Sequence, residues 1–227
     1  MNIQYLGHAT FLITTQGKRV LVDPFITGNP LAKDKINVDQ IEADAILVTH
    51  GHGDHVLDVV RIARRTGALI ISNFEIIDWF GKQDCQGHPM NFGGTKTFDF
   101  GTVKSVYAAH SSTLPDGSAG GNPGGFVLWN NEACIYLAGD TSLTMDMQLI
   151  PMMCPPLDLA VLPVGDNFTM GYHDAIKAAD MVKCHRVLGC HYDTFEMIEI
   201  DHNAARQAFA EAGKELILLD IEDSLDV

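Results

Sequence analysis

The chain has few basic residues. Its 227 residues include 15 Lys and Arg against 29 Asp and Glu, so the formal net charge is -14 at pH 7. Even two bound divalent cations would leave it clearly negative. Proteins that bind nucleic acid contact its phosphates mainly through Lys and Arg. The composition therefore argues against nucleic acid as a partner.

Long apolar runs are also missing. No stretch of about 18 apolar residues is present that would cross a membrane as a helix. The N-terminus has no basic region followed by an apolar segment, as a secretory signal would have. We therefore expect no membrane association and a cytoplasmic location. The length and the 46% of hydrophobic residues suit one globular domain, which we predict to span residues 1–227.

Paired cysteines are absent as well. The five cysteines are odd in number and none forms a Cys-x-x-Cys pair. This pattern indicates buried, reduced thiols rather than a disulfide framework or a thiolate-rich metal site. Cys190 precedes His191, so a ligand or nucleophile role has to be considered there, but a thiol at a strand end is more often part of the core.

Histidines are concentrated in one short segment, where three of the chain's ten lie within six residues. Residues 50–55 read His-Gly-His-Gly-Asp-His and directly follow the apolar run 45–48, which predicts a buried strand. The two glycines let the backbone curl after that strand. Imidazole and carboxylate are ligands that zinc, manganese and iron accept, and a site without thiolate keeps the metal a good Lewis acid. We interpret the segment as a catalytic metal site; the alternative is a His-rich surface turn.

Strands and helices are predicted to alternate along the chain, which indicates a layered α/β or α+β domain. The predicted strands cover residues 2–6, 10–15, 18–22, 46–49, 68–71, 96–100, 103–109, 126–129, 134–137, 158–162, 187–190 and 215–219. The predicted helices cover residues 56–66, 73–80, 174–183 and 203–212. Acidic or histidine residues come where six of these strands end: Asp23, His50, His110, Asp140, Asp166 and His191. Strand ends hold polar side chains in fixed positions, so we expect a site there.

Several local features carry smaller predictions. Residues 27–40 and 111–125 are loops expected to influence substrate choice, and we interpret 111–125 as a mobile active-site loop rather than a linker. It is not a phosphate-binding P-loop, because Gly-Lys-Ser/Thr is missing. Asp58 is expected on the exposed side of the helix over 56–66, and the acidic tail 222–227 is expected to fray.

Two further histidines have open interpretations. His8 follows the first strand, and it is either a pocket residue near the metal or a core histidine bonded to a carbonyl; we place it beside the metal ligands. His88 precedes a proline and nothing near it marks a ligand, so a solvated or structural role is favoured.

The pattern His-x-His-x-Asp-His after an apolar strand resembles the signature of the metallo-β-lactamase superfamily. Segments 7–11, 88–91 and 168–171 are similar to its bacterial branch of metal-dependent hydrolases, a branch similar to ascorbate-6-phosphate lactonase. The resemblance covers nearly the whole chain and implies a four-layer αββα sandwich with a metal site at its edge. Residues 171–173, Gly-Tyr-His, depart from the Gly-Pro-Glu expected there, which leaves substrate details open.

The resemblance implies seven ligands for two divalent ions, with zinc or manganese favoured and iron also fitting. The implied sites are His50, His52 and His110 for the first ion, Asp54, His55 and His191 for the second, and Asp140 as the bridge. Hydrolysis would then use a hydroxide shared by the two ions. Asp54 would orient this hydroxide, and His8 would donate a hydrogen bond to the developing oxyanion.

The expected substrate is a small-molecule ester, lactone, amide or phosphoester. An iron-dependent oxidoreductase or thiol dioxygenase on the same fold is the main alternative, because redox iron uses the same ligands. A binding module with a structural metal is disfavoured by the lack of cysteine ligands, and a nuclease by the acidic charge. The resemblance also allows a homo-oligomer.

Overall fold

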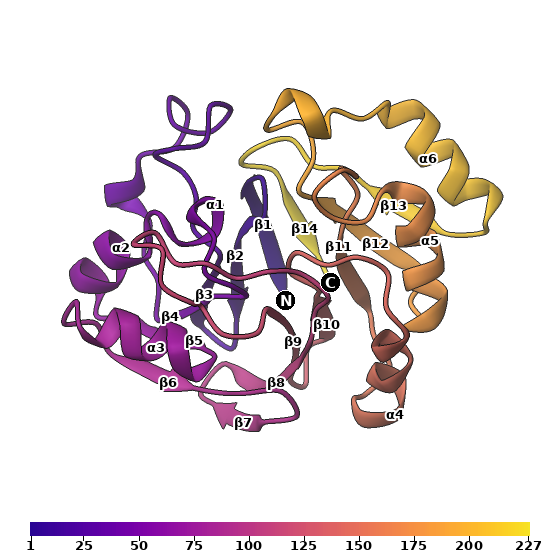
Figure 1. Cartoon of the computed structure of the whole chain (residues 1–227). Helices are drawn as coiled ribbons and strands as arrows, with labels where there is room; N and C mark the ends of the chain where they lie inside the picture. The colour runs from indigo at the N-terminus through magenta and orange to yellow at the C-terminus, as the bar shows by residue number, and fades with distance from the viewer.

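Two seven-stranded sheets with helices on their outer faces make up the computed structural model, which describes residues 1–227 (Figure 1). The first sheet has the order β14-β1-β2-β3-β4-β5-β6. Its strands are β1 (Asn2–Gly7), β2 (Thr10–Thr15), β3 (Lys18–Val22), β4 (Ala45–Leu47), β5 (Leu69–Ser72), β6 (Gly87–Pro89) and β14 (Ser224–Asp226).

The second sheet has the order β13-β12-β11-β10-β9-β8-β7. Its strands are β7 (Thr95–Phe98), β8 (Gly101–Tyr107), β9 (Gly124–Trp129), β10 (Cys134–Leu137), β11 (Leu159–Pro163), β12 (Arg186–Cys190) and β13 (Glu215–Ile217). The helices are α1 (Gly53–Val56), α2 (Val59–Thr66), α3 (Phe74–Gly81), α4 (Ile150–Met153), α5 (Tyr172–Met181) and α6 (His202–Glu211). Three short 3-10 helices are η1 (Val38–Gln40), η2 (Met145–Leu149) and η3 (Glu196–Ile198).

Alternation along the buried strands explains the layers. In β10, Ile135 and Leu137 join a hydrophobic cluster that also contains side chains of the first sheet. The intervening Cys134 and Tyr136 join a second cluster, to which α5 and α6 contribute. Successive side chains of a strand point to opposite faces, so a strand that is apolar throughout is buried on both sides.

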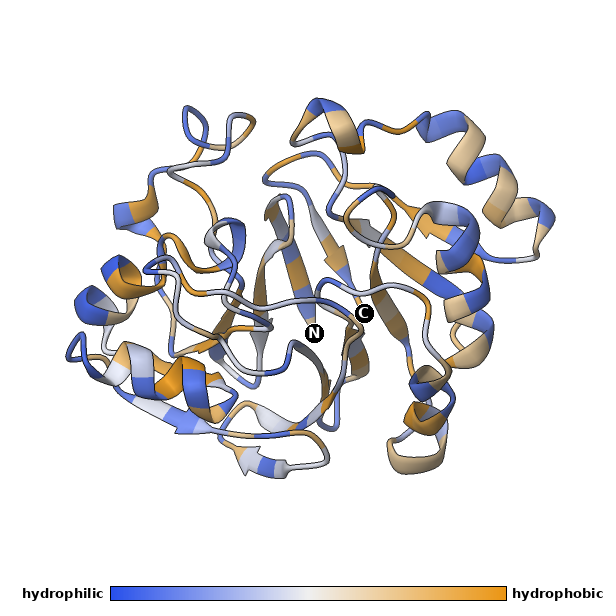
Figure 2. Ribbon diagram, viewed as in Figure 1, coloured by the Kyte–Doolittle hydropathy of each residue, from blue (hydrophilic) through white to orange (hydrophobic).

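The first sheet follows the same rule. Ala45 and Leu47 of β4 pack between the sheets, whereas Ile46 packs in a third cluster with residues of α2 and α3. Hydrophobic clusters therefore lie between the two sheets and beneath the helices on each side. In Figure 2 the hydrophobic colour falls on many residues of the strands and on parts of the helices. This arrangement confirms the predicted αββα sandwich.

The strand directions bring polar residues to one edge. β1, β3 and β4 run the same way, because β2 is antiparallel to β1 and β3 while β4 is parallel to β3. β8, β10, β11 and β12 likewise share a direction in the second sheet. The two edges meet, since the backbone N–H of His191 after β12 donates to the carbonyl of His8 after β1 at 2.9 Å.

The prediction of a frayed tail over residues 222–227 is wrong. β14 pairs antiparallel with β1, and Leu225 packs against the cluster between the sheets. Asn2 Nδ2 donates to Asp226 Oδ1 at 2.8 Å across 224 positions of sequence. The two ends of the chain consequently lie close together (Figure 1).

The helix expected over residues 56–66 begins later, as α2 at Val59, after the short α1 that ends at Val56. Asp58, between the two helices, is buried rather than exposed. Its carboxylate accepts hydrogen bonds from the N–H groups of Ile26 and Thr27 at 2.6 and 2.9 Å, and from Thr27 Oγ1 at 2.6 Å. Asp58 therefore anchors the loop that follows β3. The expected C-cap, Gly67, is present with φ 74°.

The loop over residues 111–125 connects β8 to β9 within the second sheet, so it is not a linker. It lies against the His-rich segment, where the N–H of Gly51 donates to Ser112 Oγ at 3.0 Å. Leu114 is buried in the cluster beneath α2 and α3. His88 lies in β6, away from the other histidines named above.

No helix has the length and apolar character needed to span a bilayer.

Candidate metal centre

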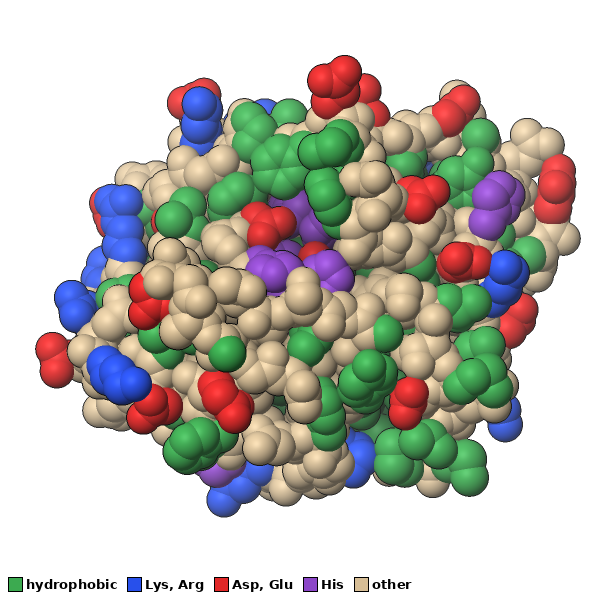
Figure 3. All heavy atoms as spheres, in the orientation of Figure 1, with side chains coloured by type: hydrophobic (Ala, Val, Ile, Leu, Met, Phe, Trp, Pro, Cys, Tyr) green, Lys and Arg blue, Asp and Glu red, His purple; other side chains and the backbone are tan.

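The structure gathers all seven predicted ligands at the edge where the two sheets meet. Figure 3 shows histidine and acidic side chains in a central hollow of this face. The ligating atoms of His50, His52 and His110 lie within 4.8 Å of one another. His50 Nε2 and His52 Nδ1 are 3.0 Å apart. Two nitrogens that each lie about 2.1 Å from one tetrahedral ion would be about 3.4 Å apart, so the observed distance suits two ligands of the same ion.

A second group lies beside the first. The ligating atoms of Asp54, His55 and His191 are within 4.8 Å of one another, and His8 belongs to the same group. Asp54 Oδ2 is 3.9 Å from His55 Nε2 and 3.8 Å from His191 Nε2. Asp54 and His55 come from α1, which starts at the curl that the sequence predicts, whereas His191 ends β12.

Asp140 lies between the two groups. Its Oδ2 is 3.8 Å from His50 Nε2 and 3.5 Å from His110 Nε2 in the first group. The same oxygen is 3.3 Å from His55 Nε2 and 3.0 Å from His191 Nε2 in the second. One buried carboxylate oxygen thus faces four imidazole nitrogens, as a ligand shared by two sites would.

Buried partners orient the ligand rings. His55 Nδ1 is 2.9 Å from Oδ2 of Asp23, which follows β3. Thr49 Oγ1 donates to the same carboxylate oxygen at 2.6 Å and lies 3.0 Å from His50 Nδ1. With their Nδ1 atoms engaged in this way, His50 and His55 turn Nε2 toward the centre. Sequence reasoning marked Asp23 only as a residue at a strand end, and it missed Thr49.

His8 is held between two polar groups. Its Nε2 is 3.1 Å from Asp54 Oδ2, and its Nδ1 is 2.9 Å from Thr194 Oγ1. Burial lowers the pKa of His8 to about 4, so the ring is neutral at neutral pH. Because an ionised carboxylate only accepts, Nε2 carries the hydrogen and the hydroxyl of Thr194 donates to Nδ1. Sequence reasoning missed Thr194, which no motif marks.

The electrostatics of the centre favour ionised carboxylates and, in the first ligand group, neutral imidazoles. Burial lowers the pKa of His50, His52 and His110, which leaves them in the form that binds metal. Burial alone would raise the pKa of Asp140, but His55 and His191 hold it well below its usual value.

The same balance acts in the second group. Burial opposes the ionisation of Asp54, but the hydrogen bond from His8 and the charge of His55 hold its pKa below the usual value. At His55 burial lowers the pKa, yet the carboxylates of Asp140 and Asp23 raise it well above the usual value. The two carboxylates therefore favour a positive charge at His55.

Unsatisfied polar atoms test whether a metal fits. His55 Nε2 and Asp140 Oδ1 are buried and have no hydrogen-bond partner, although buried polar atoms are normally paired. His55 Nε2 lies among the other candidate ligands, 3.3 Å from Asp140 Oδ2 and 3.9 Å from Asp54 Oδ2, and imidazole with carboxylate is a donor set that divalent cations accept. The residues present therefore fit a divalent metal ion.

Other candidates from the sequence lie elsewhere. Asp166 and His173 line a separate cavity of about 530 Å³ that shares no lining residue with the candidate ligands. Cys190 is buried in the cluster between the sheets, and burial raises the pKa of its thiol well above the usual value. It is therefore a core residue.

Comparisons with known proteins agree with this geometry. The family model described as the β-lactamase superfamily domain matches residues 2–191. A metal-dependent hydrolase of Christiangramia forsetii is 54% identical to this chain over 227 residues, and one of Flavobacterium johnsoniae is 52% identical over 227 residues. Each alignment covers 100% of this chain and 100% of the relative. The solved structure of Igni18, a metallo hydrolase from the hyperthermophilic archaeon Ignicoccus hospitalis, matches with a TM-score of 0.88 at 30% identity, covering 99% of this chain and 97% of that one. The chain therefore belongs to the β-lactamase superfamily, in its branch of metal-dependent hydrolases.

Proposed function

We propose that this chain hydrolyses an ester, lactone, amide or phosphoester of a small molecule at a centre of two divalent metal ions. The observation that carries the proposal is the place of Asp140 between the two ligand groups. Its Oδ2 lies 3.5 Å from His110 Nε2 in one group and 3.0 Å from His191 Nε2 in the other. A carboxylate shared in this way supports two neighbouring cations rather than one.

Each ion would have its own set of ligands. His50, His52 and His110 would hold the first, Asp54, His55 and His191 the second, and Asp140 would join them. Zinc and manganese are favoured, and iron accepts the same donors. Bound there, two divalent ions supply Lewis acidity, which lowers the pKa of water toward neutrality and polarises a carbonyl or phosphoryl oxygen.

Asp54 is the carboxylate best placed to act on an attacking water. Its side chain is 28% exposed, whereas that of Asp140 is 4% exposed. Oδ2 receives the hydrogen bond from His8, and no protein group donates to Oδ1. Oδ1 is therefore available to accept a hydrogen bond from water and to orient it.

His8 would position Asp54. Both of its ring nitrogens have partners, Asp54 on Nε2 and Thr194 on Nδ1, so neither is free for the oxyanion role that the sequence suggests. Its donated hydrogen bond fixes which oxygen of Asp54 faces the second ligand group and lowers the pKa of that carboxylate. We therefore assign His8 to holding Asp54 rather than to the reacting oxygen.

Metal content and turnover test the proposal together. Elemental analysis of the purified protein is expected to find about two equivalents of zinc or manganese, with loss of at least one in His52→Ala and Asp140→Ala. His88→Ala is the matched control, because this histidine lies in β6 outside both groups. The metal-loaded protein is expected to hydrolyse at least one of the four substrate classes. No product from any class would contradict the proposal, and bound iron with oxygen consumption would favour an oxidoreductase.

A further inference from the structure

Two aromatic rings from distant segments close one side of the metal centre. The ring of Phe25, in the loop after β3, lies 5.6 Å from the ring of His8. The ring of Phe195, just before η3, also lies 5.6 Å from His8, and the two phenyl rings are 6.4 Å apart. Phe25 is buried, but Phe195 is only half-buried. An edge of Phe195 is therefore left for another molecule to contact.

Leu57 extends this apolar surface. It follows α1 directly, two residues after the candidate ligand His55, and is 50% exposed. A Cβ at Gly28 would come within 2.6 Å of both Leu57 Cδ2 and Phe25 Cε2, so these two side chains press against the same stretch of backbone. We call Phe25, Leu57 and Phe195 the apolar wall. Figure 3 shows hydrophobic side chains gathered at the rim of the hollow that holds the histidines.

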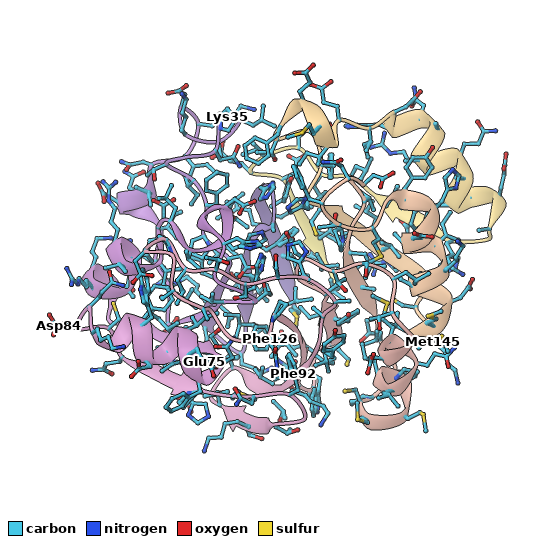
Figure 4. All side chains as sticks on the ribbon, in the orientation of Figure 1. Lys35, Glu75, Asp84, Phe92, Phe126 and Met145 are labelled. Carbon is cyan, nitrogen blue, oxygen red and sulfur yellow. The ribbon has the colours of Figure 1, made fainter.

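The centre offers no side-chain cation besides histidine. The charged and hydrogen-bonding groups that act most strongly on the pKa of Asp54 are His8, His55 and Asp140, and those that act most strongly on Asp140 are His55 and His191. Figure 3 shows Lys and Arg only around the periphery of this face. Lys35, in the loop that also carries Phe25, lies at the outer end of that loop (Figure 4).

We propose that the group of the substrate beyond the reacting bond is apolar and uncharged, and that it packs against Phe195 and Leu57. This inference rests on the proposed function, because the metal ions would hold the reacting end. Apolar contact is worth about 0.8 kcal/mol per buried methylene. No Lys or Arg side chain is seen in the hollow to pair with a second anionic group of the substrate, and Asp54, with 28% of its side chain exposed, would repel one.

Hydroxamic acids test this inference without requiring turnover, because the hydroxamate group binds divalent metal directly. The probes are acetohydroxamic acid, octanohydroxamic acid and the eight-carbon analogue that ends in a carboxylate, each titrated calorimetrically into zinc-loaded protein. Octanohydroxamic acid is expected to bind at least about tenfold tighter than acetohydroxamic acid. The carboxylate-ended analogue is expected to lose most of that gain.

Substitutions of Phe195 test whether the tighter binding of the eight-carbon chain comes from contact with the apolar wall. Phe195→Ala is expected to reduce the preference for the eight-carbon chain about tenfold, and Phe195→Leu, which keeps an apolar side chain, to retain most of it. Phe92→Ala is the control, because Phe92 packs on Tyr107 and lies far from the hollow (Figure 4). A circular dichroism spectrum and zinc content equal to wild type show that each variant is folded.

The outcomes separate the two proposals. Binding with equal affinity for short and long chains, or a preference unchanged in Phe195→Ala, overturns the apolar-wall inference and leaves the proposed hydrolase intact. Tighter binding of the carboxylate-ended analogue also overturns it. If no hydroxamic acid binds the zinc-loaded protein, the metal centre of the proposed function fails, and the inference that depends on it fails too.

Discussion

His55 Nδ1 lies 2.9 Å from Oδ2 of Asp23, so a buried carboxylate that follows β3 orients a candidate ligand from α1. Asp23 also accepts hydrogen bonds from the N–H of Thr49 at 2.8 Å and from Thr49 Oγ1 at 2.6 Å. Through Thr49 it reaches His50 as well. One aspartate therefore supports a histidine in each of the two ligand groups, and its ligating atom lies within 4.8 Å of those of His50 and His55.

Asp23→Asn is expected to weaken metal binding 10- to 100-fold, which is typical when a residue that orients metal ligands is replaced. Asparagine has no negative charge, and its NH2 group can only donate a hydrogen bond where an oxygen of Asp23 accepts one. Zinc affinity measured by competition with a chromogenic chelator checks the prediction. Asp166→Asn is the matched control, because Asp166 also follows a strand but lines the separate cavity. Equal zinc affinity in both variants would contradict the role assigned to Asp23.

Thr194→Val is expected to lower kcat about tenfold while leaving zinc content at the wild-type level. Valine has the shape of threonine but cannot donate to His8 Nδ1, so the hydrogen on the His8 ring is no longer fixed at Nε2 and Asp54 loses its partner for part of the time. Thr194→Ser keeps the hydroxyl and is expected to restore kcat. Nitrogen NMR of His8 gives a direct readout, since a purely structural role would leave the wild-type tautomer in place in Thr194→Val.

Asp58→Ala is expected to reduce the free energy of unfolding by about 3 kcal/mol, since hydrogen bonds to a charged group are worth about 1.5–3 kcal/mol each and buried donors would be left unpaired. The donors are the N–H groups of Ile26 and Thr27 and the hydroxyl of Thr27. Urea denaturation in the presence of a chelator measures the loss without the contribution of bound metal. Asp39→Ala provides the comparison, because its exposed pair with Arg61 is expected to contribute less than about 1 kcal/mol. A loss at Asp58 no larger than at Asp39 would rule out the anchoring role.

The sequence predicts the parts of this molecule that depend on local pattern. The apolar runs predict most strands, and the His-rich segment lies within six residues, so neither needs knowledge of the fold. The more distant candidates, His110, Asp140 and His191, follow from the resemblance to the metallo-β-lactamase superfamily, and the structure brings them together. The strand-end pattern alone also marked Asp166, which lies elsewhere.

Features built from contacts between distant segments were not predictable in this way. Thr194 contacts His8 across 186 positions, and its own surroundings in the sequence show no motif. β14 has only three residues and forms because the edge of β1 offers unpaired backbone groups, which a local pattern cannot show. Asp58 was misplaced because a carboxylate beside a predicted helix usually faces solvent, whereas here three donors of the preceding loop compensate for its burial.

Gly165 packs against the backbone of His191, a candidate metal ligand. A Cβ there would collide with the backbone oxygen of His191 and come within 3.1 Å of Ile198 Cβ. Neither neighbour can move freely, because the N–H of His191 donates to the carbonyl of His8 and His191 has φ 55°. Any shift at this position therefore moves a candidate ligand.

Gly165→Ala is accordingly expected to cost about 1–3 kcal/mol of unfolding free energy, as overpacked sites do, and to lower zinc content below that of wild type. Gly81→Ala separates this clash from a general effect of replacing glycine. A Cβ at Gly81, the last residue of α3, meets no atom within 4 Å, and alanine favours a helix by up to about 1 kcal/mol. Urea denaturation with a chelator and elemental analysis give the two readouts. Wild-type stability and zinc content in Gly165→Ala would show that the end of β12 can shift without disturbing His191.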